Sequence, residues 1–205
     1  MKRAIKYNIT IVLGAMICFL IHALAVHATD FQADVIQKIQ GKDMKGKFFV
    51  KDKKYRLDLN MMGKRMSTIT RMDKKVIWIV QHDNRMIIEM PAKTRSPQTF
   101  QFDEELKKIA TKKKIGSEKM NGFDCDKYEI VYHDQKMGKA TMWFSTKLNF
   151  PIKIVYHGPQ GEMSTEYKNI KIGNVKDSLF EPPQGFQKMV MPAMGKSMGN
   201  MMPPQ

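Results

Sequence analysis

Two histidines that end similar tetrapeptides are the first residues here whose type and spacing suggest chemistry. The run Ile-Val-Tyr-His occupies residues 130–133 and again residues 154–157. If both runs are strands of an up-and-down sheet with one strand between them, their backbones lie about 10 Å apart. A metal ion shared by His133 and His157 would need reach from both side chains and a third ligand. We therefore favour surface histidines at strand ends over a metal site.

Methionine is unusually frequent near the C-terminus, where thioether sulfurs could bind Cu(I). The candidate ligands are Met191, Met194, Met198, Met201 and Met202. Glycine and proline interrupt this stretch and little in it could pack, so residues 188–205 are predicted to be a disordered tail. Low-complexity sequence without metal binding is the favoured alternative.

Motifs for enzymatic chemistry are missing from the sequence. No nucleophile elbow, glycine-rich phosphate loop or zinc-protease motif occurs. The carboxylates of Glu104 and Glu105 are neighbours on a predicted helix and cannot face each other. We therefore predict a protein without catalytic activity and without a cofactor.

The first residues indicate export. Three cationic residues precede the apolar run 9–26, and residues 26–28 are compact enough for signal peptidase. We predict a signal peptide over residues 1–28, cleaved after Ala28, and a periplasmic mature protein. An uncleaved anchor is the alternative, because the run is close to spanning length. His22, His27 and the polar pair that follows favour cleavage.

Charge and cysteine content limit the partners. The signal removes three positive charges from the formal +15, which leaves +12 on the mature protein. An exported protein seldom meets nucleic acid, so an anionic membrane surface or acidic polymer is the favoured partner. Lysines that keep the protein soluble and protect strand edges are the alternative. Only Cys125 remains after cleavage, and a buried inert thiol is expected there. The sequence predicts no oligomeric state.

Residues 47–91 predict five short strands joined by tight turns. Residues 55–59 alternate between apolar and charged side chains, as in a strand with one buried face. Asp83 and Asn84 form a two-residue loop that tolerates positive φ. Connections this short require antiparallel neighbours. The strand at residues 76–80 is apolar on both faces, so it needs a helix, a second sheet or a ligand cavity against it.

Other segments complete one domain over residues 29–187. Residues 31–40 predict a first strand, although a helix fits nearly as well, and residues 41–46 a loop. Residues 102–113 carry apolar side chains on one face and lysines in the last turn, which predicts an amphipathic helix. This helix should lie on the strand at residues 76–80. Strands resume after Gly116, giving about ten antiparallel strands in all.

Several motifs together resemble a known family. They are GKFFV (46–50), KYRLD (54–58), TITRMD (68–73), RMIIEMP (85–91), NGFDCDKY (121–128) and LFEPPQGF (179–186). The chain looks like the exported bacterial proteins of domain of unknown function 4412. That family is more distantly similar to the outer-membrane lipoprotein carrier (LolA) and its receptor LolB. The resemblance implies an antiparallel half-barrel wrapped round a helical lid, with an apolar cavity between them.

The resemblance also implies a role for one arginine. In the carrier, an arginine on an early strand helps to hold the lid closed, and Arg56 stands at the most similar position. This sequence lacks the proline that follows in the carrier. An exposed arginine on a solvated face is the alternative.

Together these observations predict a non-catalytic envelope protein that binds a lipid or acylated ligand. Methionines suit a cavity for such ligands because their side chains adapt, although plain core filling is the alternative. The predicted cavity residues are Val76, Trp78, Val80, Met66, Met86, Leu106, Ile109 and Met142. Two other functions stay open: metal handling or a stress response through the methionine-rich tail, and protein binding as a scaffold or sensor.

Overall fold

The computed structural model describes residues 30–39, 41–61, 63–92 and 104–191. Its strands are β1 (Phe31–Ile39), β2 (Lys42–Lys51), β3 (Lys54–Met61), β4 (Lys64–Arg71), β5 (Val76–Gln81), β6 (Met86–Pro91), β7 (Ala110–Met120), β8 (Phe123–Tyr132), β9 (Lys139–Ser145), β10 (Phe150–Gly158), β11 (Gly161–Ile172) and β12 (Gln187–Val190). The helical segments are α1 (Glu104–Ile109) and the short 3₁₀ turns η2 (Gln135–Met137) and η3 (Asp177–Phe180).

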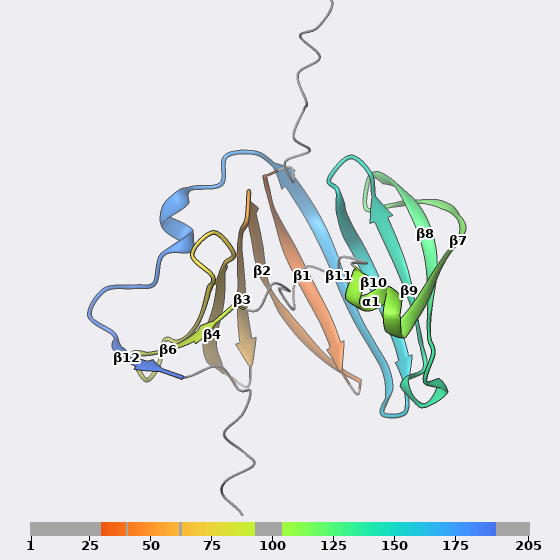
Figure 1. Cartoon of the computed structure of the whole chain (residues 1–205). Helices are drawn as coiled ribbons and strands as arrows, with labels where there is room; N and C mark the ends of the chain where they lie inside the picture. Colours follow the sequence, from red (N-terminus) through yellow and green to blue (C-terminus); the bar gives the residue numbers. More distant parts are fainter. Residues whose placement is uncertain (1–29, 40, 62, 93–103, 192–205) are drawn as a thin grey trace, which may run out of the picture.

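The twelve strands form one sheet in the order β12-β6-β5-β4-β3-β2-β1-β11-β10-β9-β8-β7 (Figure 1). Neighbours are antiparallel except β12 and β6, which run parallel. The sheet has two arms, because β1 pairs with β2 on one side and with β11 on the other. The first six strands and β12 form one arm, and β7 to β11 form the other.

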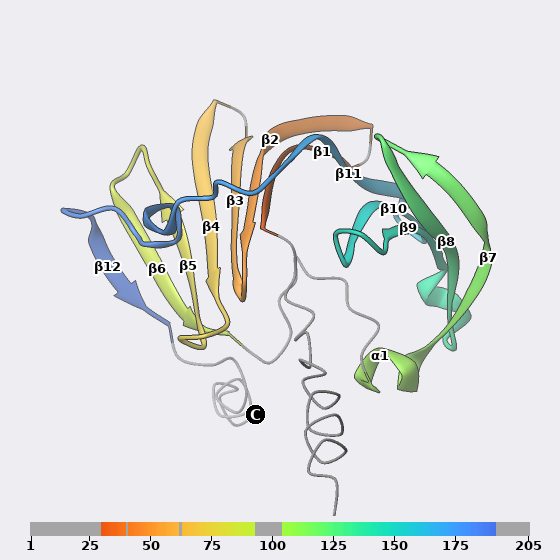
Figure 2. The same cartoon turned by 90° about the horizontal axis from the view of Figure 1, so that it is seen from above.

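Aromatic packing shows how strongly the sheet curls. Two strands, β1 and β11, separate Phe48 of β2 from Phe150 of β10, a distance of about 14 Å across a flat sheet. The centroids of the two rings are nevertheless 5.6 Å apart. The sheet must therefore bend so that its arms face each other, and Figure 2 shows this arch from above. The fold is a mainly β half-barrel, as the sequence predicts.

A cluster of aromatic residues fills one end of the concave face. Phe31 and Phe48 are fully buried. Their rings contact each other and Phe150, and Tyr167 contacts Phe48 and Phe150, with ring centroids 4.9 to 6.2 Å apart. Leu148, Ile152, Val35 and Val50 complete this closed end. We call this group the aromatic plug.

A second cluster lies on the convex face of the first arm. Ile69, Trp78, Val80 and Ile87 pack there against Val175 and Phe180. The last two residues belong to residues 173–186, which we call the C-terminal segment. It leaves β11, crosses the first arm and leads into β12 (Figure 1).

Register explains why strand β5 is apolar on both faces. Trp78 pairs with Ile69 of β4, and both point to the convex face under the C-terminal segment. Ile77 and Ile79 alternate with them and point to the concave face. The apolar partner that the sequence predicts for this strand is, on the convex face, the chain's own C-terminal segment. It is not the helix.

Several predicted boundaries differ from the structure. Residues 31–39 form a strand whose alternate residues are buried, not a helix. Residues 42–46 extend β2 instead of forming a loop, because they pair with β1. The turn after β5 spans residues 82–85, and Arg85 has the positive φ. Residues 188–190, assigned to the tail, lie in β12.

The predicted helix over residues 102–113 is wrong at its C-terminal end. Helix α1 ends at Ile109, and residues 110–113 begin β7. Their backbone pairs with β8, and Ala110 packs against Ile130 and Ala140 in the core. Sheet pairing and burial therefore outweigh the helical pattern of the lysines. Helix α1 lies against β7, at the other end of the sheet from β5.

Replacing Phe180 by alanine tests the role of the C-terminal segment. Phe180 is fully buried, with 0% of its surface accessible to solvent. We expect Phe180→Ala to lower the free energy of unfolding, measured in urea, by roughly 3 to 5 kcal/mol. The half-buried Leu179 next to it is the control, and Leu179→Ala should cost clearly less. Equal small losses would show that the segment does not stabilise the sheet.

Candidate functional site

The concave face beyond the aromatic plug is apolar but only half-buried. On the first arm, side chains of β3 to β6 line this face in register across four strands. They are Leu59, Met66, Ile79, Ile88 and Met90, all partly exposed. Apolar surface that stays accessible within a curved sheet is the usual lining of a site for apolar ligands.

The second arm presents a matching wall. Its half-buried members are Tyr128, Tyr132, Ile154 and Tyr156, which pack on the buried residues Ala110, Ile130, Ala140 and Met142. The rings of Tyr132 and Tyr156 meet edge to face with centroids 6.2 Å apart. Charged groups also lie in this wall: the Lys112 ammonium is 3.9 Å from the Tyr128 ring centroid, and Lys114 pairs with Asp126 at 2.6 Å. Burial lowers the pKa of Lys112.

The structure brings together only some of the predicted cavity residues. Met66 and Met86 lie on the concave face of the first arm, and Met142 is buried within the second wall. Trp78 and Val80 are buried on the convex face, which Val76 shares with them, and the Trp78 indole donates to Glu89 at 2.7 Å.

The two predicted cavity residues of the helix, Ile109 and Leu106, are not shown to line the concave face. Ile109 is 43% exposed at the end of α1. The side chain of Leu106 lies outside the described part of the structure.

Sequence reasoning missed most residues of the concave wall, among them Ile79 and Ile88. The signal was present in the period of the strand. Alternation places residues 77 and 79 on one face and residues 76, 78 and 80 on the other. Register with the neighbouring strands then decides which of these faces is concave.

Arg56 holds the C-terminal segment. Its guanidinium donates to the Asp58 carboxylate at 2.7 Å, to the Leu179 carbonyl at 2.9 Å and to the Ser67 hydroxyl at 3.3 Å. The resemblance to the carrier implies an arginine that holds a lid. The described contacts of Arg56 lead to the C-terminal segment and not to α1.

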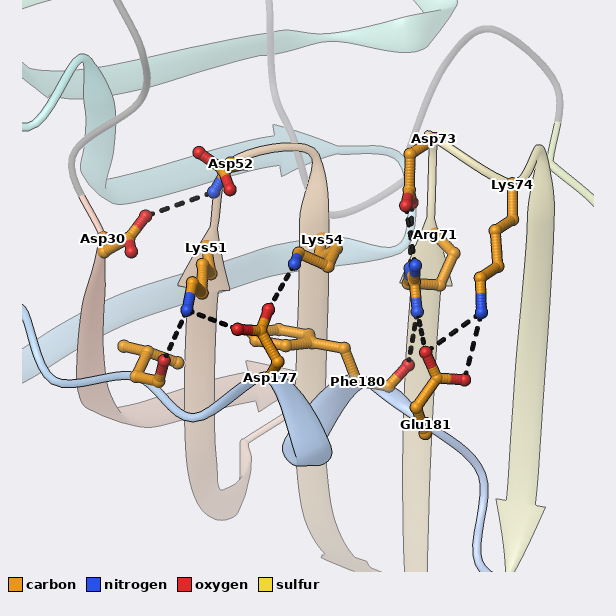
Figure 3. A network of polar contacts seen from close by, with 11 residues as sticks. Asp30, Lys51, Asp52, Lys54, Arg71, Asp73, Lys74, Asp177, Phe180 and Glu181 are labelled. Carbon is orange, nitrogen blue, oxygen red and sulfur yellow. Dashed lines mark hydrogen bonds and ion pairs between the residues drawn. The ribbon is translucent and has the colours of Figure 1, made fainter.

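Two groups of ion pairs fasten the same segment (Figure 3). Lys51 and Lys54 donate to Asp177 at 2.7 and 2.5 Å and lower the pKa of its carboxyl to about 2. Arg71 pairs with Glu181 and with Asp73, the latter at 2.6 Å.

Glu181 titrates under opposing influences. Its partial burial alone would raise its pKa, but hydrogen bonds from Lys74 and Arg71 outweigh that and lower it. The Arg71 guanidinium likewise lowers the pKa of Asp73. The carboxylates of Asp177, Glu181 and Asp73, which take part in these ion pairs, therefore favour the ionised form in the folded protein.

The other candidate residues show no shared site. His133 contacts the Lys108 carbonyl at 3.0 Å, whereas His157 lies 3.5 Å from Glu162. Among the described residues, no three histidine, cysteine, aspartate or glutamate side chains form a group that could hold a metal ion. Cys125 is a buried thiol, as predicted, and burial raises its pKa to about 11.

Of the five methionines proposed as Cu(I) ligands, the structure describes one. The backbone N–H of Met191 donates to the Glu89 carbonyl at 2.7 Å. Met194, Met198, Met201 and Met202 lie outside the described residues.

Within the described residues, no helix is long and apolar enough to cross a membrane. Fold and concave face together define a protein of the lipoprotein-carrier-like half-barrel class. Residues 34–149 match the family described as "Domain of unknown function (DUF4412)", so the chain belongs to that family. Among curated protein sequences, none matches this chain.

Two solved structures share the fold at low sequence identity, and a third matches less well. An uncharacterized conserved protein from Thermus thermophilus is 13% identical, with a TM-score of 0.60 over 80% of this chain and 91% of that one. The Pseudomonas aeruginosa MucA/MucB complex matches at 13% identity and a TM-score of 0.55, over 78% of this chain and 58% of that one. A LolA superfamily protein from Nitrosomonas europaea has a TM-score of 0.35 at 9% identity, over 76% and 91%.

Acid should weaken the attachment of the C-terminal segment. The pKa of Asp177 in the folded protein lies below its ordinary 3.8. The ionised carboxylate therefore stabilises the fold above that value, and this stabilisation is lost as the pH falls from about 5 to about 2. We expect Asp177→Asn to lower the urea midpoint near neutral pH and to flatten its fall in acid.

Asp124→Asn is the matched control, because the exposed Asp124 carboxylate has no ion-pair partner among the described residues. This variant should keep the acid dependence of the parent protein. An unchanged acid dependence in Asp177→Asn would contradict the role assigned to the ion pairs.

Proposed function

We propose that this protein binds a lipid or an acyl chain on the concave face of its half-barrel, without catalysis. One observation carries this proposal: both arms present apolar side chains that remain half-exposed beyond the aromatic plug. Leaving this much apolar surface accessible costs about 25 cal/mol per Å², so a ligand that covers it gains that free energy. The predicted signal peptide supports a site of action in the periplasm.

The shape of the sheet favours a long, flexible ligand. The aromatic plug closes the concave face at one end, so a ligand must enter from the other end or from the open side. Methionines at positions 66, 86 and 90 add side chains that adapt to different chain positions.

A second candidate function is protein binding, as in a scaffold or sensor. The Pseudomonas structure with the same fold was solved as a complex of MucA with MucB. In this chain, strand β7 lies at the edge of the sheet and presents an eleven-residue edge that a partner strand could join. Metal handling by the methionine-rich tail remains a prediction from the sequence.

Native mass spectrometry tests the proposed ligand. Protein purified from the envelope without detergent should carry a co-purified lipid mass. We expect Ile79→Asp to reduce binding of a fluorescent fatty acid at least about tenfold, because it places a charge in the apolar wall. Val131 is an exposed residue on the convex side, and Val131→Asp is the matched control with no expected effect.

A variant that fills the site tests whether reduced fatty-acid binding comes from loss of the site and not from unfolding. Met90→Trp adds apolar volume to the same wall and should weaken fatty-acid binding while keeping the thermal midpoint. Absence of any lipid mass, together with equal binding by all variants, would contradict the proposal. Peptide binding that proline substitutions in β7 abolish would then favour the protein-binding function.

A further inference from the structure

A pocket on the first arm is lined by both charged and apolar residues, and its charged side chains lie on the convex face. It has a volume of about 350 Å³ and extends over β2, β3 and β4 to the turn after β5. The register directs seven of its lining side chains to the convex face: Lys45, Lys47, Arg56, Asp58, Asn60, Arg65 and Ser67. Four of these side chains are cations and one is a carboxylate.

Internal pairing leaves an excess of positive charge in this pocket. Arg56 pairs with Asp58 at 2.7 Å, and Lys47 pairs with Asp34 on β1. Among the described residues, Lys45 and Arg65 have no carboxylate partner for their side chains. Two cations, one from β2 and one from β4 on either side of β3, thus line the same pocket.

Neutral donors in the same pocket are held in place. The buried Ser67 hydroxyl lies 2.7 Å from the His82 Nε2 and receives a hydrogen bond from Arg56. The Arg56 guanidinium also bonds to the Leu179 carbonyl, which fixes its orientation. An anion that enters the pocket therefore meets a guanidinium that needs little reorganisation, and this lowers the entropic cost of binding.

We propose that this pocket binds a phosphate group. Two unpaired cations and a fixed arginine offer more donors than the two oxygens of a carboxylate accept, whereas a phosphate presents three or more oxygens. Guanidinium groups also match phosphate oxygens in a bidentate geometry. The phosphate could belong to a lipid headgroup or to a free, soluble molecule. The pocket shares Leu59 and Met66 with the proposed acyl wall, but its charged side chains lie on the opposite face. Variants at Lys45 and Arg65 therefore test the phosphate site separately from variants at Ile79.

Titration with inorganic phosphate at constant ionic strength tests this site. We expect saturable changes in the amide NMR signals of residues 45–47, 65–67 and 82. The double variant Lys45→Gln with Arg65→Gln should weaken the affinity roughly tenfold, since two charge-assisted bonds are lost. Arg56 is left unchanged because it also holds the C-terminal segment.

A charge-matched control separates a site from general attraction. Lys119 and Lys136 are exposed cations away from the pocket, and their double replacement by glutamine should change the affinity less than about twofold. A parallel titration with phosphatidylglycerol vesicles distinguishes the two sources of phosphate. Binding of inorganic phosphate alone indicates a soluble ligand, and pocket-dependent binding of vesicles alone indicates a headgroup. Equal losses in the two double variants, or no saturable binding to either probe, would overturn the proposal.

Discussion

The packing of four aromatic rings across the concave face is the interaction on which this structure depends. Phe31, Phe48, Phe150 and Tyr167 come from four neighbouring strands and meet only because the sheet bends. Without that contact, β1 and β11 would join two arms with no reason to face each other. Burial of these rings stabilises the curvature and closes one end of the concave face. The accessible apolar walls beyond the plug are a consequence of the same bend.

The first arm carries apolar side chains on both of its faces, and each face needs a partner that covers it. Its convex face is covered from within the chain by the C-terminal segment, through Val175, Phe180 and the ion pairs of Lys51, Lys54 and Arg71. Its concave face keeps half-exposed side chains. A sheet that covers one apolar face with its own chain and leaves the other accessible is suited to a binding function. The basic pocket beside the C-terminal segment gives the convex face a separate polar site.

Local pattern was sufficient to predict most of the strands and their antiparallel pairing, although it gave about ten strands where the sheet has twelve. Short turns and period-2 alternation determine these features without long-range information. The half-barrel class came from the family resemblance, which also named the group to which the chain belongs. Local pattern could not predict whether a given apolar residue of the sheet points to the concave or to the convex face. Val76, Trp78 and Val80 are as apolar as Ile77 and Ile79, and only pairing with distant strands and the C-terminal segment assigns the former to the convex side.

Long-range pairing also explains the error in the helix. Lys112 and Lys113 follow the phase of an amphipathic helix. Their backbone instead pairs with β8, and Ala110 packs in the core against Ile130 of that strand. Likewise, nothing in the sequence indicates that residues 187–190 pair in parallel with β6, because that contact joins segments about a hundred residues apart.

The central claim is that the concave face binds the apolar ligand while the convex face does not. Paramagnetic broadening by a spin-labelled fatty acid tests it most directly, read on the methyl signals of adjacent residues. We expect the signals of Ile79, Ile88 and Met90 to broaden and those of Ile69 and Val80 to stay sharp. Broadening of Ile69 and Val80 with sharp signals from Ile79 and Ile88 would contradict the account.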